Sequence, residues 1–155
     1  MIRAYRLCKT RHVATAFTGD GARIAGGRWN SPGIPVVYAS STLSLATLEV
    51  LVHLDDPDAF ARLFSWFSVE IPDSLIEVFD ESQLPPGWCA DETTNSTRAI
   101  GDDWARSQRS AVLAVPSIVT SGERNYLINP GHPRTPSIRI ASPQAFRPDP
   151  RLMKG

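Results

Sequence analysis

Proline and glycine interrupt this chain so often that only short regular elements fit between them. The 155 residues include 13 prolines and 10 glycines, and proline breaks helices and is confined to the edges of sheets. The densest such stretch, residues 18–35, excludes regular helix and predicts a long structured loop. Loops of that length in compact domains tend to be functional. No internal repeat or heptad pattern is present, so short elements must build the fold.

Short apolar or alternating segments predict the strands. They are residues 2–8, 36–39, 64–71, 111–115, 125–128 and 137–140. Because they are short and separated by turn residues, we expect them to pair mainly antiparallel. The predicted fold class is α+β, a single compact domain over residues 1–155 with flanking helices. Its core covers about residues 2–140, and residues 143–155 form a proline-rich tail.

Two main helices are predicted from capping residues and apolar spacing. Ser41 caps the first, which runs to about Leu54. Ser96 caps the second, which runs to about Ser107 and is interrupted early by Gly101. Residues 82–96 before it are expected to be irregular.

Charge and cysteine content narrow the function classes. Sixteen basic residues balance sixteen acidic ones, which argues against a broad nucleic-acid-binding surface. Cys8 and Cys89 show neither zinc spacing nor a disulfide framework, so we expect free thiols in a reducing compartment. The N-terminus lacks a signal-sequence pattern, and no apolar run reaches the roughly 18 residues of a membrane span. A soluble, cytoplasmic protein is therefore expected.

The loop GGRWNSPG, from Gly26 to Gly33, carries the first candidate site residue. Its glycines allow close backbone approach, and Arg28 follows them directly, well placed to grip a phosphate or carboxylate through two nitrogens. Trp29 offers a flat face or a core anchor. The alternative is a simple turn whose arginine pairs with a surface acid.

The first predicted helix is apolar around most of its circumference, which is typical of a buried helix. One narrow stripe, spaced by four, three and four, holds Thr42, Ala46, Glu49 and His53. A carboxylate on such a helix is costly unless it is paired or faces a polar cavity. Glu49 therefore either points into a pocket with a partner such as Arg28, forms a structural salt bridge, or touches water.

Two further residues are candidates by position. Tyr38, at the end of a short strand, could place its ring over a heterocycle, or it could be half-buried packing. Ser117 follows a buried strand, where sites often form, although a turn hydroxyl is the common reading. No nucleophile elbow surrounds Ser117, and histidine and cysteine do not cluster at metal-ligand spacing.

Together these segments resemble the RES domain, a bacterial toxin family named for its Arg, Glu and Ser. The matching motifs are GGRWNSPG with Arg28, VVYAS with Tyr38, SLATLEVLVHL with Glu49, IGDDW (Ile100 to Trp104), VPS with Ser117, and NYLINPGHP (Asn125 to Pro133). They occur in family order and span residues 2 to about 140.

The resemblance implies the toxin of a type II toxin–antitoxin pair, silenced by an Xre-type helix-turn-helix antitoxin, with an ADP-ribosyltransferase-like fold. It implies depletion of cellular NAD by cleavage of the nicotinamide–ribose bond, with NAD as substrate and inorganic phosphate as a possible co-substrate. Water, phosphate and a protein all remain open as acceptors of ADP-ribose. The resemblance implies no direct DNA binding and no membrane, and it is compatible with a homodimer within the complex.

The resemblance also implies site roles. The catalytic residues are Arg28, Glu49 and Ser117; the NAD-binding residues are Arg28, Tyr38, Ser117 and Asn129; Trp29 and His53 support them, and no metal is implied. Cleavage would develop an oxocarbenium-like cation on the ribose, which a fixed Glu49 carboxylate could stabilise. Arg28 could clamp the pyrophosphate.

Two alternatives stay open. One is a mono-ADP-ribosyltransferase that modifies a protein target. The other is a non-catalytic nucleotide- or RNA-binding module, for which the C-terminal end offers basic residues. These are Arg134, Arg139, Arg147, Arg151 and Lys154.

Overall fold

A single curled sheet organises the protein in the computed structural model, which describes residues 1–54, 63–90 and 95–153. The strand order is β4-β5-β6-β2-β1-β3-β7, and β8 also pairs with β3. The strands are β1 (Ile2–Lys9), β2 (Val37–Ser40), β3 (Phe64–Ile71), β4 (Ile76–Val78), β5 (Val112–Pro116), β6 (Arg124–Ile128), β7 (Arg139–Ile140) and β8 (Gln144–Ala145). The α-helices are α1 (Asp20–Ala25), α2 (Leu43–Leu51) and α4 (Asn95–Ser107). Short 3-10 turns are η1 (Thr10–Thr15), η2 (Asp73–Leu75), η3 (Glu81–Gln83), η4 (Thr135–Ser137) and η5 (Pro150–Met153).

The predicted α+β class with mainly antiparallel pairing is confirmed. Of the strand pairs among the described residues, β4–β5 is parallel and the others are antiparallel. Each of the six predicted strands is present with small shifts, and residues 64–71 match in full. The last one is shorter than predicted, because residues 135–137 form a 3-10 turn. The sequence patterns missed β4 and β8, and β8 brings part of the proline-rich tail into the sheet.

The prediction that residues 18–35 contain no regular helix is wrong. A short helix, α1, occupies Asp20–Ala25. Gly19 precedes it with φ 76°, and Gly26 ends it with φ 75°. These left-handed conformations suit glycine, so the glycines that suggested a loop instead set the two ends of a helix.

The predicted bounds of α2 also need correction. The cap is Thr42, not Ser41, since its side-chain oxygen accepts a hydrogen bond from the Leu45 main-chain nitrogen at 3.0 Å. The helix ends at Leu51 rather than Leu54. Full burial was wrong too, because Leu48 and Val52 are 39% and 59% exposed.

The second main helix, α4, ends at Ser107 as predicted but begins at Asn95, so Ser96 lies inside it rather than capping it. Gly101 does not interrupt the helix. The main chain of Trp29 packs against this glycine so closely that a Cβ atom there would overlap the Trp29 carbonyl oxygen. Residues 91–94, part of the stretch expected to be irregular, lie outside the described residues.

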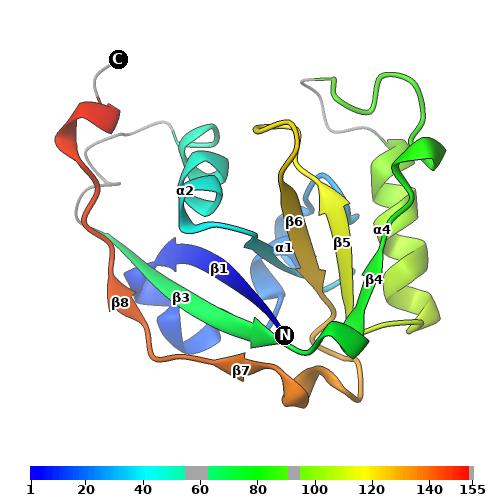
Figure 1. Ribbon diagram of the computed structural model, residues 1–155, viewed down its shortest axis with the longest axis horizontal. Coiled ribbons are helices and arrows are strands. Elements are labelled where there is room, and N and C mark those ends of the chain that lie inside the picture. The colour runs from blue at the N-terminus through cyan, green and yellow to red at the C-terminus, as the bar shows by residue number, and fades with distance from the viewer. Residues whose placement is uncertain (55–62, 91–94, 154–155) are drawn as a thin grey trace.

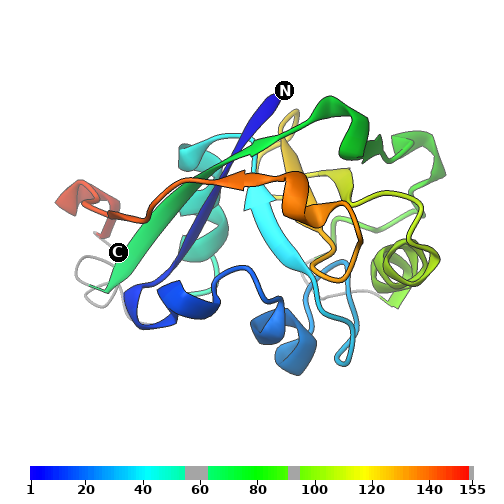
Figure 2. The same ribbon diagram turned by 90° about the horizontal axis from the view of Figure 1, so that it is seen from below.

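The two faces of the sheet bury different clusters. One face carries a continuous core to which β3 contributes Val69 and β5 contributes Val112. Since three strands separate β3 from β5 in the sheet, the sheet must curl around this core. The other face carries two separate apolar clusters, one including Ala46 of α2 and one including Trp104 of α4. Figure 1 shows these helices apart, with β5 and β6 between them, and Figure 2 shows β1 and β3 as one long antiparallel pair.

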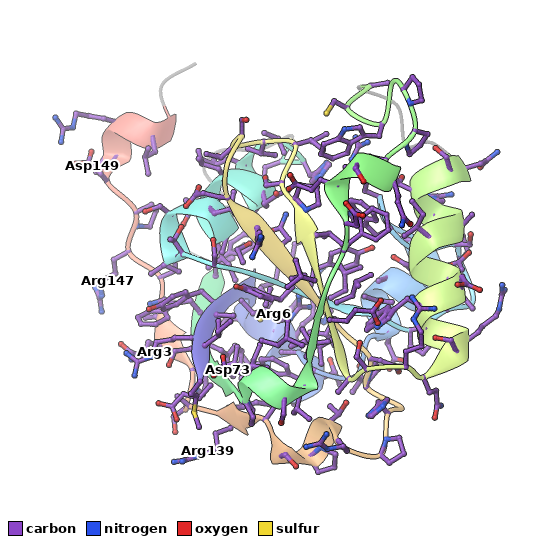
Figure 3. All side chains as sticks on the ribbon, turned by 45° about the vertical axis from the view of Figure 1, so that its right-hand side comes forward. Arg3, Arg6, Asp73, Arg139, Arg147 and Asp149 are labelled. Atoms are coloured by element: carbon purple, nitrogen blue, oxygen red, sulfur yellow. The ribbon has the colours of Figure 1, made fainter. Side chains whose placement is uncertain are left out.

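Arg6 links β1 to its neighbours from the interior of the molecule (Figure 3). Its Nε donates to the Ala16 carbonyl at 2.7 Å, and its Nη1 donates to the Tyr38 carbonyl at 2.8 Å. Burial lowers the pKa of this guanidinium. The described register of β1 with β2 is limited to Tyr5 opposite Ser40, so Arg6 supplies a connection where the ladder is short.

Both cysteines, Cys8 and Cys89, are free thiols, as predicted. Among the described residues, no helix combines the length and the apolar character needed to cross a membrane.

Candidate active site

Glu49 lies at the centre of a polar cluster between the two apolar clusters of one sheet face. Its Oε1 accepts hydrogen bonds from Ser117 Oγ at 2.9 Å and from Asn125 Nδ2 at 2.7 Å. The side chain is half-buried. Two neutral donors therefore hold the carboxylate, and within the described residues Glu49 does not form the salt bridge that was one alternative.

The Ser117 hydroxyl is fixed in direction. It is buried directly after β5, and its oxygen accepts hydrogen bonds from the main-chain nitrogens of Val119 and Thr120 at 3.1 and 3.2 Å. Because its lone pairs are occupied in this turn, its proton points to Glu49. Ser117 is thus both a turn hydroxyl and a ligand of the candidate catalytic carboxylate.

Asn125 is the site residue that sequence reasoning missed. Its amide nitrogen donates to Glu49, while its Oδ1 accepts from Ser40 Oγ at 2.7 Å. In the antiparallel ladder of β2 and β6, Ser40 and Asn125 are directly opposed. Asn125 opens the quoted motif NYLINPGHP, but only the strand pairing shows that it faces α2 and not the other side of the sheet.

The Arg28 guanidinium contacts main-chain carbonyls. Its Nη1 donates to the Trp88 oxygen at 3.0 Å and its Nη2 to the Ala90 oxygen at 3.1 Å. The suggested pairing of Arg28 with Glu49 is therefore replaced by a two-point hold on the segment after β4. Trp29 was expected to offer either a flat face or a core anchor, and it is a core anchor. It is almost fully buried, and its ring centroid lies 6.3 Å from that of Trp88.

Tyr38 fixes the loop that carries Arg28. Its hydroxyl accepts a hydrogen bond from the Trp29 nitrogen at 3.2 Å and donates to Asn30 Oδ1 at 2.6 Å. Burial raises the pKa of this phenol well above its ordinary value, although the Trp29 N–H and nearby Arg98 oppose the shift. Tyr38 is therefore a neutral hydroxyl at physiological pH.

One face of α4 holds the same loop from the other side. Thr97 Oγ1 donates to the Arg28 carbonyl at 2.6 Å, and Arg98 Nε donates to the Gly27 carbonyl at 2.9 Å. Asp102 accepts from the Ser31 nitrogen at 2.8 Å. The bond to Asp102, together with the close approach of the Trp29 main chain to Gly101, gives a structural reason for two residues of the IGDDW segment.

The two halves of the site meet on β2. Tyr38 and Ser40 are two residues apart, so their side chains leave the same face of the strand. Tyr38 holds the Arg28 loop and Ser40 holds Asn125 beside Glu49. Arg28, Tyr38, Glu49 and Ser117 are thus tied into one connected region.

Asn129 and His53 are placed differently from the expected pocket. Asn129 follows β6 at the end opposite Ser117, since Pro116 pairs with Arg124 and Val112 with Ile128. Its Nδ2 donates to the Ala105 carbonyl at 3.1 Å, which anchors the turn after the strand. His53 lies beyond the end of α2 and is exposed.

An open hollow of about 640 Å³ lies elsewhere, beside β3 and β8, with Thr10, Ser65 and Arg147 in its lining. None of the candidate catalytic or NAD-binding residues lines it. Within the described ranges, no three His, Cys, Asp or Glu side chains gather as a metal ion would need.

Known proteins resemble this chain over nearly its whole length. The RES domain family matches residues 3–149. A protein of Sphingobium sp. (strain YBL2) named "Prs ADP-ribosylating toxin" is 38% identical over 146 residues, covering 92% of this chain and 90% of that protein. A "Toxin Res" of Yersinia enterocolitica is 38% identical over 149 residues, covering 96% and 97%.

A solved structure supports the fold. The M. tuberculosis MbcT–MbcA toxin–antitoxin complex contains a chain that superposes with a TM-score of 0.73 at 17% identity, covering 98% of this chain and 86% of that one. The family match and the two relatives establish that this chain belongs to the RES domain family.

Proposed function

We propose that this chain is the toxin of a type II toxin–antitoxin pair and depletes cellular NAD by cleaving the nicotinamide–ribose bond. The observation that carries the proposal is the Glu49 carboxylate, held by Ser117 and Asn125 between two apolar clusters. Loss of nicotinamide leaves positive charge on the ribose. A carboxylate oriented in advance stabilises such a cation without reorganising at the moment of reaction.

Arg28 would bind the NAD pyrophosphate with its remaining donors. A guanidinium has five N–H groups, and among the residues that the structure describes the two bonds to the Trp88 and Ala90 carbonyls leave three of them. Phosphate oxygens suit this planar fork. The Tyr38 hydroxyl is committed to Trp29 and Asn30, so its role would be to position the Arg28 loop and to present its ring edge to the substrate.

The remaining roles follow from placement. Ser117 would act by orienting Glu49 and by offering polar contact to the ribose or the nicotinamide amide. Asn125 takes the place that Asn129 held among the expected NAD-binding residues, because Asn125 contacts Glu49 directly. Trp29 would support the site as a core anchor. His53, exposed beyond the end of α2, would support it only from the edge of the site.

Transfer of ADP-ribose to a protein is the second candidate. It is favoured by the 38% identical relative whose name describes an ADP-ribosylating toxin. Both reactions begin with the same bond cleavage and differ in the acceptor, which would be water or inorganic phosphate in one case and a protein side chain in the other.

We also propose a cognate antitoxin of the Xre type in the cytoplasm, since the fold matches a chain solved in a toxin–antitoxin complex.

An RNA-binding module is less well supported by the charges on the surface. Figure 3 shows Arg3, Arg139 and Arg147 along one side of the molecule. Glu70 pairs with two of them, because its carboxylate oxygens lie 3.3 Å from Arg3 Nη2 and 3.8 Å from Arg139 Nη1. Arg151 is paired with Asp149 at 2.8 Å.

The test is nicotinamide release from NAD by the purified protein, with and without inorganic phosphate. Wild type should release nicotinamide, and Glu49→Gln, which keeps the side-chain shape but removes the charge, should lose most of the activity. Glu81→Gln is the matched control, because Glu81 is exposed in η3. Equal release by wild type and Glu49→Gln would refute the assignment of Glu49.

The products decide between the two candidates. Free ADP-ribose indicates hydrolysis, and a phosphate-dependent product indicates phosphorolysis. Labelled NAD that leaves covalent label on a protein of the host extract indicates transfer instead. Expression of the chain alone should arrest bacterial growth and lower cellular NAD, and Glu49→Gln should relieve both effects.

A further inference from the structure

Ser40 is a buried hydroxyl at the end of β2, only 5% exposed, to which the proposed chemistry gives no direct part. Its Oγ donates to Asn125 Oδ1 at 2.7 Å, and Asn125 Nδ2 donates to Glu49 Oε1, also at 2.7 Å. We propose that Ser40 is a positioning residue that orients the Glu49 carboxylate through Asn125 and thereby makes Glu49 Oε2 the oxygen that meets the ribose. This inference rests on the proposed function for its activity test.

The direction of the Asn125 amide is what Ser40 controls. An asparagine side chain has an acceptor end and a donor end of nearly the same shape. A carboxylate only accepts, so the donor end must face Glu49, and a flipped amide would set two oxygens against each other. With the nitrogen toward Glu49, the amide oxygen needs a donor of its own in a buried place, and the Ser40 hydroxyl supplies it.

The same contacts divide the two oxygens of Glu49. Oε1 receives both hydrogen bonds, one from Ser117 and one from Asn125. In the described part of the chain, the hydrogen bonds of Glu49 leave Oε2 unused. Two donors on one oxygen prevent the carboxylate from rotating, so Oε2 has a fixed direction. A reacting group held in this way is better preorganised than one that must search for its orientation.

The strand pairing explains why Ser40 can do this from a distance. Tyr5 lies opposite Ser40 on one side, and Asn125 lies opposite it on the other. Directly opposed residues on antiparallel strands share a face. Ser40 is therefore held between two strands on the face that α2 covers, and its hydroxyl has little freedom to choose another partner.

The experiment measures nicotinamide release as separate kcat and KM values. Ser40→Ala should lower kcat roughly 5- to 100-fold, since it leaves a buried acceptor without its donor, while KM for NAD should change less than about twofold. Ser40→Thr keeps the hydroxyl and should restore most of the lost kcat. Ser65→Ala is the matched control, because Ser65 is also a buried strand serine with a 2.8 Å bond, to Thr10, but lies away from the site.

Side-chain NMR of Asn125 gives a readout that does not depend on activity. Its amide protons should exchange with water slowly in wild type and in Ser65→Ala, and faster in Ser40→Ala. Unchanged kcat and unchanged amide exchange in Ser40→Ala would overturn the positioning role, as would an equal loss of kcat in Ser65→Ala. If wild type releases no nicotinamide but the Asn125 amide still loosens in Ser40→Ala, the proposed function fails and the positioning role stands.

Discussion

Gly101 in α4 offers the sharpest test of how the helix supports the site. A Cβ atom at this position would overlap the carbonyl oxygen of Trp29 and lie 2.7 Å from the Trp29 carbonyl carbon. Both neighbours belong to the main chain, so no side-chain rotation can relieve the overlap. Gly101→Ala should therefore push α4 away from the loop that carries Arg28.

Two opposing effects decide how much the free energy of unfolding changes: the steric clash lowers it, and the higher helix propensity of alanine raises it. Overpacking a core costs about 1–3 kcal/mol and occasionally more, and an overlap with main-chain atoms belongs at the upper end, about 3 kcal/mol. Alanine gains about 1 kcal/mol over glycine inside a helix. The net loss in the free energy of unfolding is about 2 kcal/mol, which lowers Tm by about 4–8 °C for a domain of this size.

Thermal and urea unfolding followed by circular dichroism measure this change. The matched control is Gly21→Ala, because Gly21 also lies in a helix, α1, and a Cβ atom there would meet nothing within 4 Å. That substitution should stabilise the fold by about 0.4–1 kcal/mol. The two variants thus make the same chemical change with opposite expected signs.

A melting temperature of Gly101→Ala at or above that of wild type would refute this prediction. So would a melting temperature of Gly21→Ala that is lowered as much as that of Gly101→Ala. Nicotinamide release adds a second criterion. Folded Gly101→Ala should turn over NAD more slowly than wild type, because Thr97, Arg98 and Asp102 on the same helix hold the Arg28 loop. Unchanged turnover would show that the loop tolerates the displacement of α4.

Three further outcomes follow from individual contacts. Arg28→Ala should speed proteolysis between residues 84 and 90, measured by mass spectrometry, since the Trp88 and Ala90 carbonyls lose their donor; wild-type protection in that variant would contradict the hold. Asn129→Ala should cost about 1–3 kcal/mol in urea unfolding for its lost buried hydrogen bonds yet leave turnover per folded molecule unchanged, so a selective loss of activity would return Asn129 to the site. Burial raises the pKa of Tyr38, so the unfolded chain loses this proton near pH 10 while the folded chain keeps it, and the free energy of unfolding falls as pH rises above about 10. In Tyr38→Phe the free energy of unfolding should fall less steeply with pH in that range. Identical slopes for wild type and Tyr38→Phe would contradict the burial of the phenol.

The sequence could predict the strands because each buries side chains in a readable pattern. Residues 64–71 alternate, and the run before Ser117 is continuously apolar because both faces of β5 are covered. The three-residue β4 and two-residue β8 are too short to show a period. They exist because longer neighbours, β5 and β3, offer unpaired edges, and that is a property of the assembled sheet.

Two predictions that rested on glycine were wrong for the same physical reason. Its low helix propensity suggested a loop at residues 18–35 and an interruption at Gly101. In the fold, Gly19 and Gly26 delimit α1, and Gly101 permits close contact with Trp29. Propensity describes an isolated segment, whereas the demand for a left-handed turn or a missing side chain comes from tertiary packing.

The candidate site was predictable in its members but not in its connections. Glu49 stood out because a carboxylate on an apolar helix needs partners, and it has them in Ser117 and Asn125. The pairing of Arg28 with Glu49 could not be tested from spacing, because the partners of Arg28, the Trp88 and Ala90 carbonyls, lie 60 and 62 residues away along the chain. Contacts between distant segments depend on sheet order, which the sequence patterns do not contain.

β2 shows how the core and the site specify each other. Val37 and Ala39 of this strand face the continuous core, while Tyr38 and Ser40 face the site. A register slip of one residue would turn all four side chains to the wrong face, burying two polar groups and exposing two apolar ones. The hydrophobic energy that fixes β2 therefore also fixes the spacing between the Arg28 loop and the Glu49 cluster, about 7 Å along the strand. An active region built from two distant segments can remain well ordered because this single short strand is held from both faces.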